Sequence, residues 1–444
     1  MIGFQPKWRI PVNSSTDVTI LGSGISGMSC AYHLDLSGVT VEVIEKDATY
    51  GGLCGNFTVK GYRFDRFVHF SFANNEYTRE ILECGNEMYH HKPESSNFSD
   101  GTWLRHPVQN NLFPLPLDEK LNIIKGFIED RNKYIKPENY EEWLKMQYGD
   151  YFSENYPMKY TEKYWTVPAR KLGVEWVGNR MHKPSLDEVL KGAMAANKEI
   201  NYYTKEMRYP KKGGYKSVLN KLKSNMDITY NKQVMSIDVS SKSISFKDGT
   251  IKNYTKLVSS IPLNQMPSII IDTPKNVKNA AEKLLCTGGY LVYFGFNKPN
   301  IAKKLWFYIY DKDIYPSRVF SPSLKSPDNV PVGASSLMAE VYFSKELEIK
   351  LSEEQLKEHV KDKMIAMGLF KNEDIEIYGI KKEPYANVVF THEIYENRKI
   401  VRDYVENKCG IEIVGRFGEW DYFWSDQSFE SGQRVAGQII KSKK

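Results

Sequence analysis

Hydrophobic and polar residues change their period along this chain of 444 residues. A short apolar run over residues 18–21 is followed by a glycine-rich turn, a helical pattern over about 24–36 and a second apolar run over 39–44. Strand, helix and strand in this order form one βαβ unit of the usual length. The start of the chain therefore predicts a parallel α/β layer.

Between about residues 77 and 195 the pattern becomes helical. Leu121, Ile124, Phe127 and Ile128 recur at helical spacing, and a second apolar stripe lies within residues 140–148. We interpret both stripes as the core-facing sides of helices. This segment predicts a mainly helical insertion.

The second half of the chain is rich in short strands. Apolar runs separated by turn residues occupy 228–261, and further strand candidates lie at 290–297, 335–343 and 408–417. A closing helix is expected from about Ser428 to the end. Because strand-rich and helical segments interleave, we expect discontinuous domains.

Composition excludes several function classes. The net charge of +6 comes from interleaved acidic and basic residues, so we expect no nucleic-acid partner. The five scattered cysteines include no Cys-x-x-Cys pair, which argues against zinc or a disulfide scaffold and favours the cytoplasm. No metal-binding spacing is present, and no apolar run approaches the ~20 residues that cross a bilayer.

The glycine-rich turn has the pattern of a dinucleotide fingerprint. Gly22 permits the tight turn, Gly24 lets backbone N–H groups approach a diphosphate, and Gly27 lets the helix pack closely on the strand. The helix N-terminus adds partial positive charge for the phosphates. Glu45, at the end of the second strand, is placed to accept both ribose hydroxyls, and its charge disfavours a 2′-phosphate. This order predicts dinucleotide binding.

A second glycine motif follows, formed by Gly51, Gly52 and Leu53. It resembles the motif of FAD-binding oxidoreductases of the amine oxidase and protoporphyrinogen oxidase type, whereas an ordinary Gly-Gly turn would leave NAD as the alternative. The resemblance favours FAD. It also implies that Val234 presents backbone to the adenine and that Arg416 lies at the cofactor, just before a closing helix whose N-terminus faces the flavin.

We therefore expect an α/β fold with a Rossmann-type FAD-binding domain, an inserted helical domain that caps the substrate, and an antiparallel β-sheet substrate domain. The expected boundaries are residues 1–76, 216–270 and 405–444 for the FAD-binding domain, 77–200 for the helical domain, and 201–215 with 271–404 for the sheet domain.

A series of short motifs runs through the middle and the end of the chain. The motifs are Pro107–Asn111, Tyr164–Pro168, Trp176–Arg180, Tyr209–Gly214, Leu257–Ser260 and Gly415–Tyr422. Their joint order resembles UDP-galactopyranose mutases, particularly the longer, eukaryotic-type members. In that family, reduced FAD attacks the anomeric carbon of a UDP-sugar through flavin N5, expels UDP, and lets the sugar reclose with the other ring size.

The resemblance implies a mutase that interconverts pyranose and furanose forms of an NDP-hexose, with reduced FAD and with NAD(P)H or another external reductant. Arg180 and Arg318 match two phosphate arginines, the second of them mobile, and His69 matches a histidine beside the isoalloxazine. The matched substrate contacts are Tyr308 and Tyr422 at the phosphates, and Gln109 and Trp165 in the uridine region.

The match departs from the family near the flavin and the phosphates. Two glycines before the histidine are Phe67 and Val68 here, so the backbone must run differently or leave less room. An asparagine of the uridine region is Thr161, and two phosphate-contacting tyrosines are missing from residues 321–324 and 385–387. The nucleotide and the sugar therefore stay open.

Two other function classes remain. An FAD-dependent oxidoreductase of the amine oxidase or protoporphyrinogen oxidase type would need an apolar or aromatic cavity rather than an arginine-flanked cleft. A noncatalytic FAD-stabilised binding protein is the third reading. The sequence leaves the oligomeric state open, and an oligomer is compatible with it.

Overall fold

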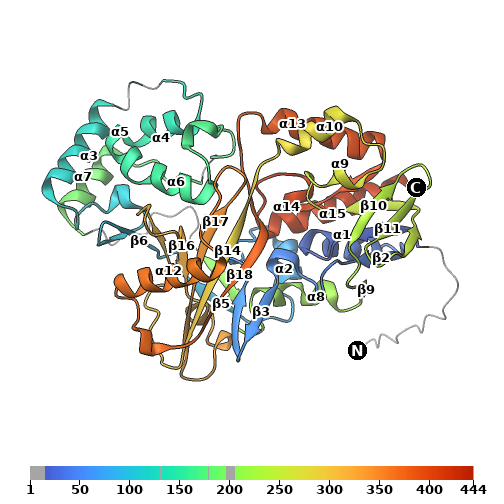
Figure 1. The fold of residues 1–444 in the computed structure, drawn as a ribbon, viewed down its shortest axis with the longest axis horizontal. Helices are drawn as coiled ribbons and strands as arrows, with labels where there is room; N and C mark the ends of the chain where they lie inside the picture. The colour runs from blue at the N-terminus through green and yellow to red at the C-terminus, as the bar shows by residue number, and fades with distance from the viewer. Residues whose placement is uncertain (1–15, 131–132, 134, 179, 197–205, 444) are drawn as a thin grey trace.

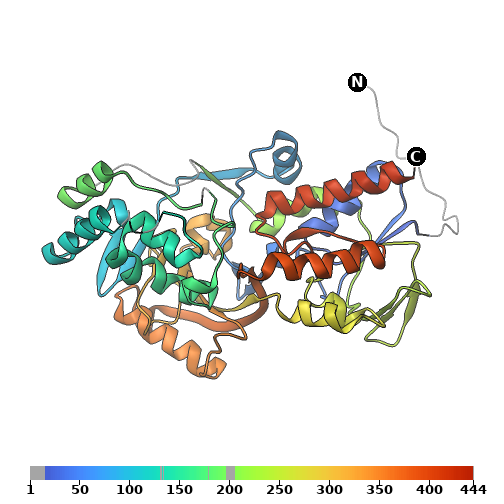
Figure 2. The same cartoon turned by 90° about the horizontal axis from the view of Figure 1, so that it is seen from above.

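The computed structural model describes residues 16–130, 133, 135–178, 180–196 and 206–443 (Figure 1). A parallel α/β layer lies at one end and a cluster of helices at the other, with a large antiparallel sheet between them (Figures 1 and 2). The predicted α/β fold class, with its Rossmann-type layer, helical insertion and antiparallel sheet, is confirmed.

The Rossmann-type layer is a sheet whose five strands all pair in parallel. Its core strand β1 (Val18–Leu21) is fully buried, as expected for a sheet covered on both faces. Helices α1 (Ile25–Leu36) and α15 (Ser425–Ser442) lie side by side next to this sheet (Figure 1). The strand order is β19 (Ile411–Ile413), β13 (Lys256–Ser259), β1 (Val18–Leu21), β2 (Val41–Ile44) and β9 (Ile228–Thr229).

A seven-stranded sheet forms the middle of the molecule. Its pairings are antiparallel except for the parallel pair β15–β6. The strand order is β18 (Ile375–Val388), β14 (Cys286–Phe296), β17 (Ser335–Phe343), β16 (Arg318–Phe320), β15 (Trp306–Ile309), β6 (Ser96–Ser99) and β7 (Thr102–Arg105).

Smaller elements complete the two sheet regions. A three-stranded sheet combines β10 (Val234–Asp238), β11 (Ser243–Phe246) and β12 (Ile251–Asn253), and two further pairs join β3 (Asn56–Val59) to β4 (Tyr62–Asp65) and β5 (Met88–His91) to β8 (Met207–Pro210). The helices beside them include α2 (Glu76–Glu83), α10 (Lys275–Glu282), α12 (Glu353–Ala366) and α13 (Ile394–Arg402).

Side-chain caps stabilise the N-termini of two helices in the helical cluster. The Asn139 side chain accepts a hydrogen bond from the first turn of α4, and Ser185 forms a capping box with Glu188 on α7. The helices are α3 (Leu117–Glu129), α4 (Tyr140–Tyr148), α5 (Asp150–Asn155), α6 (Pro157–Trp165) and α7 (Leu186–Met194).

One predicted helix face is only partly right. On α3, Phe127 is buried and Ile124 packs against the core as expected, but Leu121 and Ile128 are about half exposed, at 54% and 52%. The buried side also contains Ile123, because the backbone of Gly149 packs against Gly126; a Cβ on Gly149 would lie 2.5 Å from the Gly126 oxygen. Apolar residues lie on more than one side of this helix, so the sequence alone did not determine which side faces the core. The contact between the two glycines determines it.

Several element boundaries also differ from the sequence-based expectation. Residues 88–105, within the segment expected to be mainly helical, include β5, β6 and β7. The strand expected over 408–417 is only β19, because residues 415–418 form a helical turn, and the closing helix begins at Ser425. The domain boundaries stay a prediction, and the one at residues 200–201 lies outside the described residues.

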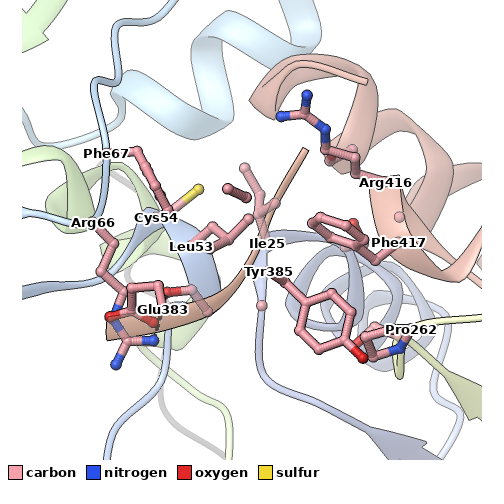
Figure 3. Close-up of a pocket in the computed structure, with 18 of the residues that line it drawn as sticks. Ile25, Leu53, Cys54, Arg66, Phe67, Pro262, Glu383, Tyr385, Arg416 and Phe417 are labelled. Carbon is pink, nitrogen blue, oxygen red and sulfur yellow. Dashed lines mark hydrogen bonds and ion pairs between the residues drawn. The ribbon is translucent and has the colours of Figure 1, made fainter. Parts of the chain in front are cut away.

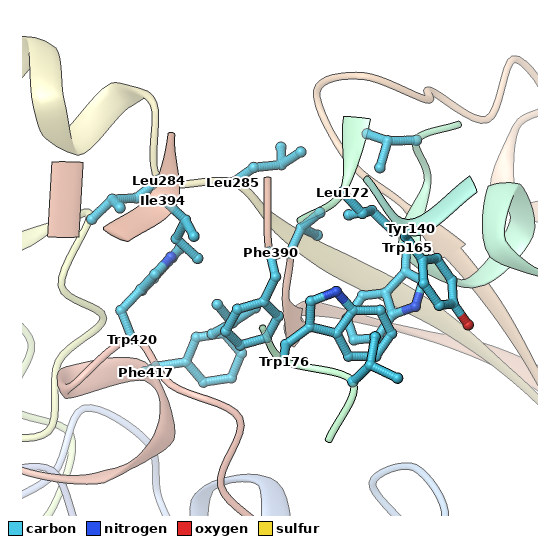
Figure 4. Close-up of a cluster of buried hydrophobic side chains, with 14 of the residues drawn as sticks. Tyr140, Trp165, Leu172, Trp176, Leu284, Leu285, Phe390, Ile394, Phe417 and Trp420 are labelled. Atoms are coloured by element: carbon cyan, nitrogen blue, oxygen red, sulfur yellow. The ribbon is translucent and has the colours of Figure 1, made fainter. Parts of the chain in front are cut away.

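A continuous aromatic core joins the three regions (Figure 4). Trp165 and Trp176 from the helical cluster lie 4.9 Å apart between ring centroids, and Trp176 stacks on Phe390 at 6.2 Å. Phe417 and Trp420, from the turn before α15, extend the same core toward the Rossmann-type layer. None of the helices within the described ranges is both long and apolar enough to cross a membrane.

Glycine allows the close packing of α1 against α15, and this gives a test. A Cβ on Gly432 would lie 2.2 Å from the Ser26 oxygen, so Gly432→Ala is expected to destabilise the protein by about 1–3 kcal/mol. Gly437→Ala, on the same helix with nothing within 4 Å, is the matched control and should stabilise it by ~0.5–1 kcal/mol. Urea unfolding measures both, and equal effects would contradict the packing.

Candidate functional site

A cavity of about 740 Å³ runs between the Rossmann-type layer and the seven-stranded sheet. At one end it is lined by Gly22, Glu45, Ser260 and Val414, which directly follow β1, β2, β13 and β19. Clefts outside the carboxyl ends of parallel strands are the usual ligand sites of such sheets. In Figure 3, Leu53, Cys54 and Phe67 lie across the cavity from Arg416 and Phe417.

Glycines shape the first end of the cavity. Gly22 has φ +99°, and a Cβ on Gly27 would lie 2.1 Å from the Gly22 oxygen, so α1 packs directly on the turn. Gly24 pairs with Gly51 in a parallel bridge, and a Cβ on Gly52 would lie 3.2 Å from the Gly24 Cα. The Cβ direction of Gly24 itself is open. The turn therefore leaves room for a diphosphate.

Glu45 is held in place at the rim of the same end. One carboxylate oxygen accepts hydrogen bonds from the backbone N–H and the hydroxyl of Ser23, at 2.8 and 2.7 Å, and the other accepts from the Asp47 N–H at 2.9 Å. The fixed carboxylate lines the cavity together with Val234. An open glycine turn, an oriented acid and a long cavity fit the adenosine diphosphate half of FAD.

His69 also lines the cavity. Its ring stacks on Tyr215 with centroids 5.1 Å apart, and burial lowers the pKa of His69 to about 4. The imidazole is therefore neutral at physiological pH. The residue two positions earlier, Phe67, has φ +63°, which a bulky side chain rarely adopts.

Three arginines lie in or beside the cavity, and their charges are compensated differently: Arg318 and Arg416 line it, and Arg180 contacts Tyr422, which lines it. Arg318 forms an ion pair with the buried Glu340, with 2.7 Å between Nε and Oε2. Arg180 and Arg416 have no carboxylate partner among the residues that the structure describes. Arg180 donates to the Trp176 and Tyr422 carbonyls at 2.7 and 3.4 Å. Arg416 donates to the Asn387 amide oxygen at 3.1 Å.

Aromatic rings connect these arginines into one wall. The guanidinium carbons of Arg180 and Arg416 lie 4.4 and 5.1 Å from the centroid of the Tyr422 ring. The Tyr164 hydroxyl bonds to the Asn387 amide oxygen at 3.2 Å, and the Arg318 guanidinium lies 5.7 Å from the Tyr164 ring. We call this wall the cationic arc; its members are Arg180, Tyr422, Arg416, Asn387, Tyr164 and Arg318.

Most of the site residues expected from the sequence line the cavity. Gly27 lies beneath the turn, and Arg180 does not line the cavity but packs its guanidinium on Tyr422 and Trp424, which do. Gln109 instead donates to the His182 carbonyl at 3.3 Å, and Trp165 packs in the aromatic core, so neither lines it. The expected residues that line the cavity are Gly22, Gly24, Glu45, Gly51, Gly52, Leu53, His69, Val234, Tyr308, Arg318, Arg416 and Tyr422.

Several members of the site were not predicted from the sequence. Tyr164, Tyr342 and Asn387 line the cavity, and Glu340 lies behind Arg318. One feature of the sequence could have indicated Glu340: it is the single acidic residue within the otherwise uncharged strand of residues 335–343. A charge in such a strand must be paired when the strand is buried. Its partner depends on strand register, which the sequence does not reveal.

Comparison with known proteins agrees with this geometry. A family model described as flavin containing amine oxidoreductase matches residues 25–389. A crystal structure of reduced UDP-galactopyranose mutase has a TM-score of 0.89 at 22% identity and covers 96% of each chain. Cyclohexylamine oxidase from Brevibacterium oxydans IH-35A has a TM-score of 0.70 at 14% identity, covering 97% of this chain and 99% of that one.

A curated relative matches only locally. The inactive all-trans-retinol 13,14-reductase of Danio rerio is 46% identical over 54 residues, which are 12% of this chain and 9% of that protein. The structural matches below 25% identity show the shared fold.

The depressed pKa of His69 predicts a pH effect on stability. Because the folded pKa of about 4 is below the usual value, the unfolded chain binds the extra proton first as pH falls below ~6.5. The free energy of unfolding therefore falls as the pH is lowered from about 6.5 to 4. At pH 5 the loss due to His69 is about 2 kcal/mol. In urea unfolding, the His69→Gln variant should lose less free energy of unfolding over this pH range than the parent protein. The exposed control variant, His392→Gln, should lose as much as the parent. Equal dependence of the free energy of unfolding on pH in all three proteins would contradict a neutral His69.

Proposed function

Because the chain belongs to the flavin containing amine oxidoreductase family and has FAD as its cofactor, we propose that it is a flavin-dependent sugar-nucleotide mutase. It interconverts the pyranose and furanose forms of an NDP-hexose and works with reduced FAD. NAD(P)H or another external donor supplies the electrons that keep the flavin reduced. The observation that carries this proposal is the cationic arc opposite the glycine turns.

The charge of the arc discriminates between the candidate substrates. Arg180 and Arg416 keep their full positive charge, since the groups that accept their hydrogen bonds are neutral. Such a wall repels the ammonium group of an amine and attracts a diphosphate. Arginine also forms bidentate contacts with phosphate oxygens, which suits a leaving group that is held and released in each cycle.

The remaining residues of the arc hold the substrate in position. The hydroxyls of Tyr308 and Tyr422 are proposed to donate to phosphate oxygens, and the neutral His69 lines the same cavity. Bound reduced FAD would supply the nucleophile for the anomeric carbon. The chain's own contribution is positioning and charge stabilisation of the departing UDP, for which precise geometry matters most.

The site also has a feature that favours the oxidoreductase alternative. Phe70, Phe72 and Trp306 line one side of the cavity, as an apolar or aromatic substrate would require. The two candidates differ in redox balance, because a mutase changes no oxidation state while an oxidase or dehydrogenase consumes an electron acceptor.

We place the reaction in the cytoplasm, where the buried Cys54 beside the cavity stays a thiol.

The direct test uses the enzyme reduced anaerobically with dithionite. Incubation with UDP-galactopyranose and related NDP-hexoses should give a ring-isomerised product, separable by chromatography, without any acceptor. Activity that appears only with oxygen or an artificial acceptor, together with oxidised product, would instead identify an oxidoreductase.

Arg180→Ala tests the role of the arc. Loss of one charge-assisted contact, worth about 1.5–3 kcal/mol, should weaken UDP binding roughly 10- to 100-fold. FAD content should not change, because Arg180 does not line the glycine end. Arg170→Ala, which removes an exposed guanidinium outside the cavity, is the control and should bind UDP normally. Unchanged UDP affinity in both variants would remove Arg180 from the binding site.

A further inference from the structure

A row of residues crosses the seven-stranded sheet beneath the cationic arc. Tyr308 on β15 pairs with Arg318 on β16, which pairs with Glu340 on β17. Tyr342 follows two positions later on β17, so its side chain points to the same face as Glu340. Strand β17 therefore presents a carboxylate and a phenol together beside the Arg318 guanidinium.

Glu340 uses both carboxylate oxygens. Oε2 accepts hydrogen bonds from Arg318 Nε and from the Tyr342 hydroxyl, each at 2.7 Å, while Oε1 accepts from the Val68 backbone N–H at 2.8 Å. The side chain of Glu340 is 0% exposed, against 15% for Arg318. A fully buried carboxylate depends on its countercharge, so any change at Arg318 alters how strongly Glu340 holds the Val68 N–H.

The segment that Glu340 holds is strained. Phe67, directly before Val68, has φ +63°, and such a conformation persists only where surrounding contacts enforce it. The Phe67 ring stacks on Tyr342 with centroids 6.0 Å apart and planes 7° from parallel. On the neighbouring strand, a Cβ on Gly289 would lie 2.6 Å from the Phe67 ring, so the glycine makes room for it.

Strand β17 thus fixes residues 67–69 by two contacts, one through a carboxylate and one through a ring. His69, which lines the cavity, follows immediately. No residue of this segment contacts Arg318 in the hydrogen bonds described, and Glu340 is the group that bonds to both. The arc and this segment are therefore connected through two buried side chains of β17: Glu340 by hydrogen bonds to both, and Tyr342, which accepts from Arg318 and stacks on Phe67.

We propose that Glu340 is a positioning residue that couples the guanidinium of Arg318 to the backbone segment of residues 67–69 beside the flavin. An anion that binds Arg318 competes with Glu340 for the guanidinium, and the change reaches the segment through the Val68 N–H. The flavin environment then responds to occupancy of the arc. The proposal rests on the proposed function only for the identity of that anion.

A double-mutant cycle on the reduction potential of bound FAD tests the coupling without any nucleotide. The variants are Glu340→Gln, Arg318→Met and the double variant, each first checked for FAD content. Coupling predicts that the two effects are non-additive by about tenfold in the reduction equilibrium constant, which is about 30 mV for a two-electron couple. A merely structural role would lower stability but leave the potentials additive.

Arg180→Met combined with Glu340→Gln is the matched control. Arg180→Met also removes a guanidinium from the arc. The hydrogen bonds of Arg180, however, go to Trp176 and Tyr422 rather than to Glu340. This second cycle should therefore be additive. Additive effects in the Arg318 cycle, or equal non-additivity in both cycles, would overturn the proposal.

Tyr342→Phe keeps the experiment decisive if Glu340→Gln loses FAD. It retains the ring that stacks on Phe67 and removes only the hydroxyl between Arg318 and Glu340. Its cycle with Arg318→Met should again be non-additive, and additivity would count against the coupling. Because the readout is the flavin itself, a failure here is distinct from an absence of mutase turnover.

Discussion

The contact between two glycine turns determines where everything else in the site lies. The Gly51 N–H donates to the Ser23 carbonyl at 2.9 Å, and the backbone of Gly52 packs on Gly24. At this distance a side chain on Gly52 would press on Gly24, whereas the Cβ direction of Gly24 stays open, and we propose that both chain segments face the same diphosphate. In the proposed binding mode, an extended cofactor anchored there would share the cavity with His69 and the cationic arc.

The arginines of the cationic arc differ in how their positive charges are compensated. Arg318 is neutralised by a buried carboxylate, whereas Arg180 and Arg416 are held by carbonyl and amide groups that leave their charge intact. A compensated arginine gives fixed geometry, and an uncompensated one gives attraction for an anion. The same wall therefore combines positioning with binding, and it also favours the negative charge of a reduced flavin.

Local features of the site were predictable, and distant pairings were not. The glycine turn, Glu45 and α1 follow from a short stretch of sequence with a fixed physical role. Glu340 and Asn387 depend on the register of strands far apart in the chain, so only the family resemblance or the structure can place their neighbours. The resemblance alone pointed to Trp165 as a uridine contact, whereas the structure buries it against Trp176 in the aromatic core.

The account stands on one claim, that the cavity holds FAD at the glycine turns and a nucleotide diphosphate at the arc. A crystal structure of the reduced holoenzyme soaked with a UDP-hexose measures this directly. Diphosphate oxygens of the substrate are expected within hydrogen-bonding distance of the Arg180 and Arg318 guanidinium groups, with the sugar facing the flavin. A ligand bound away from both arginines, or an arc closed to a diphosphate, would contradict it.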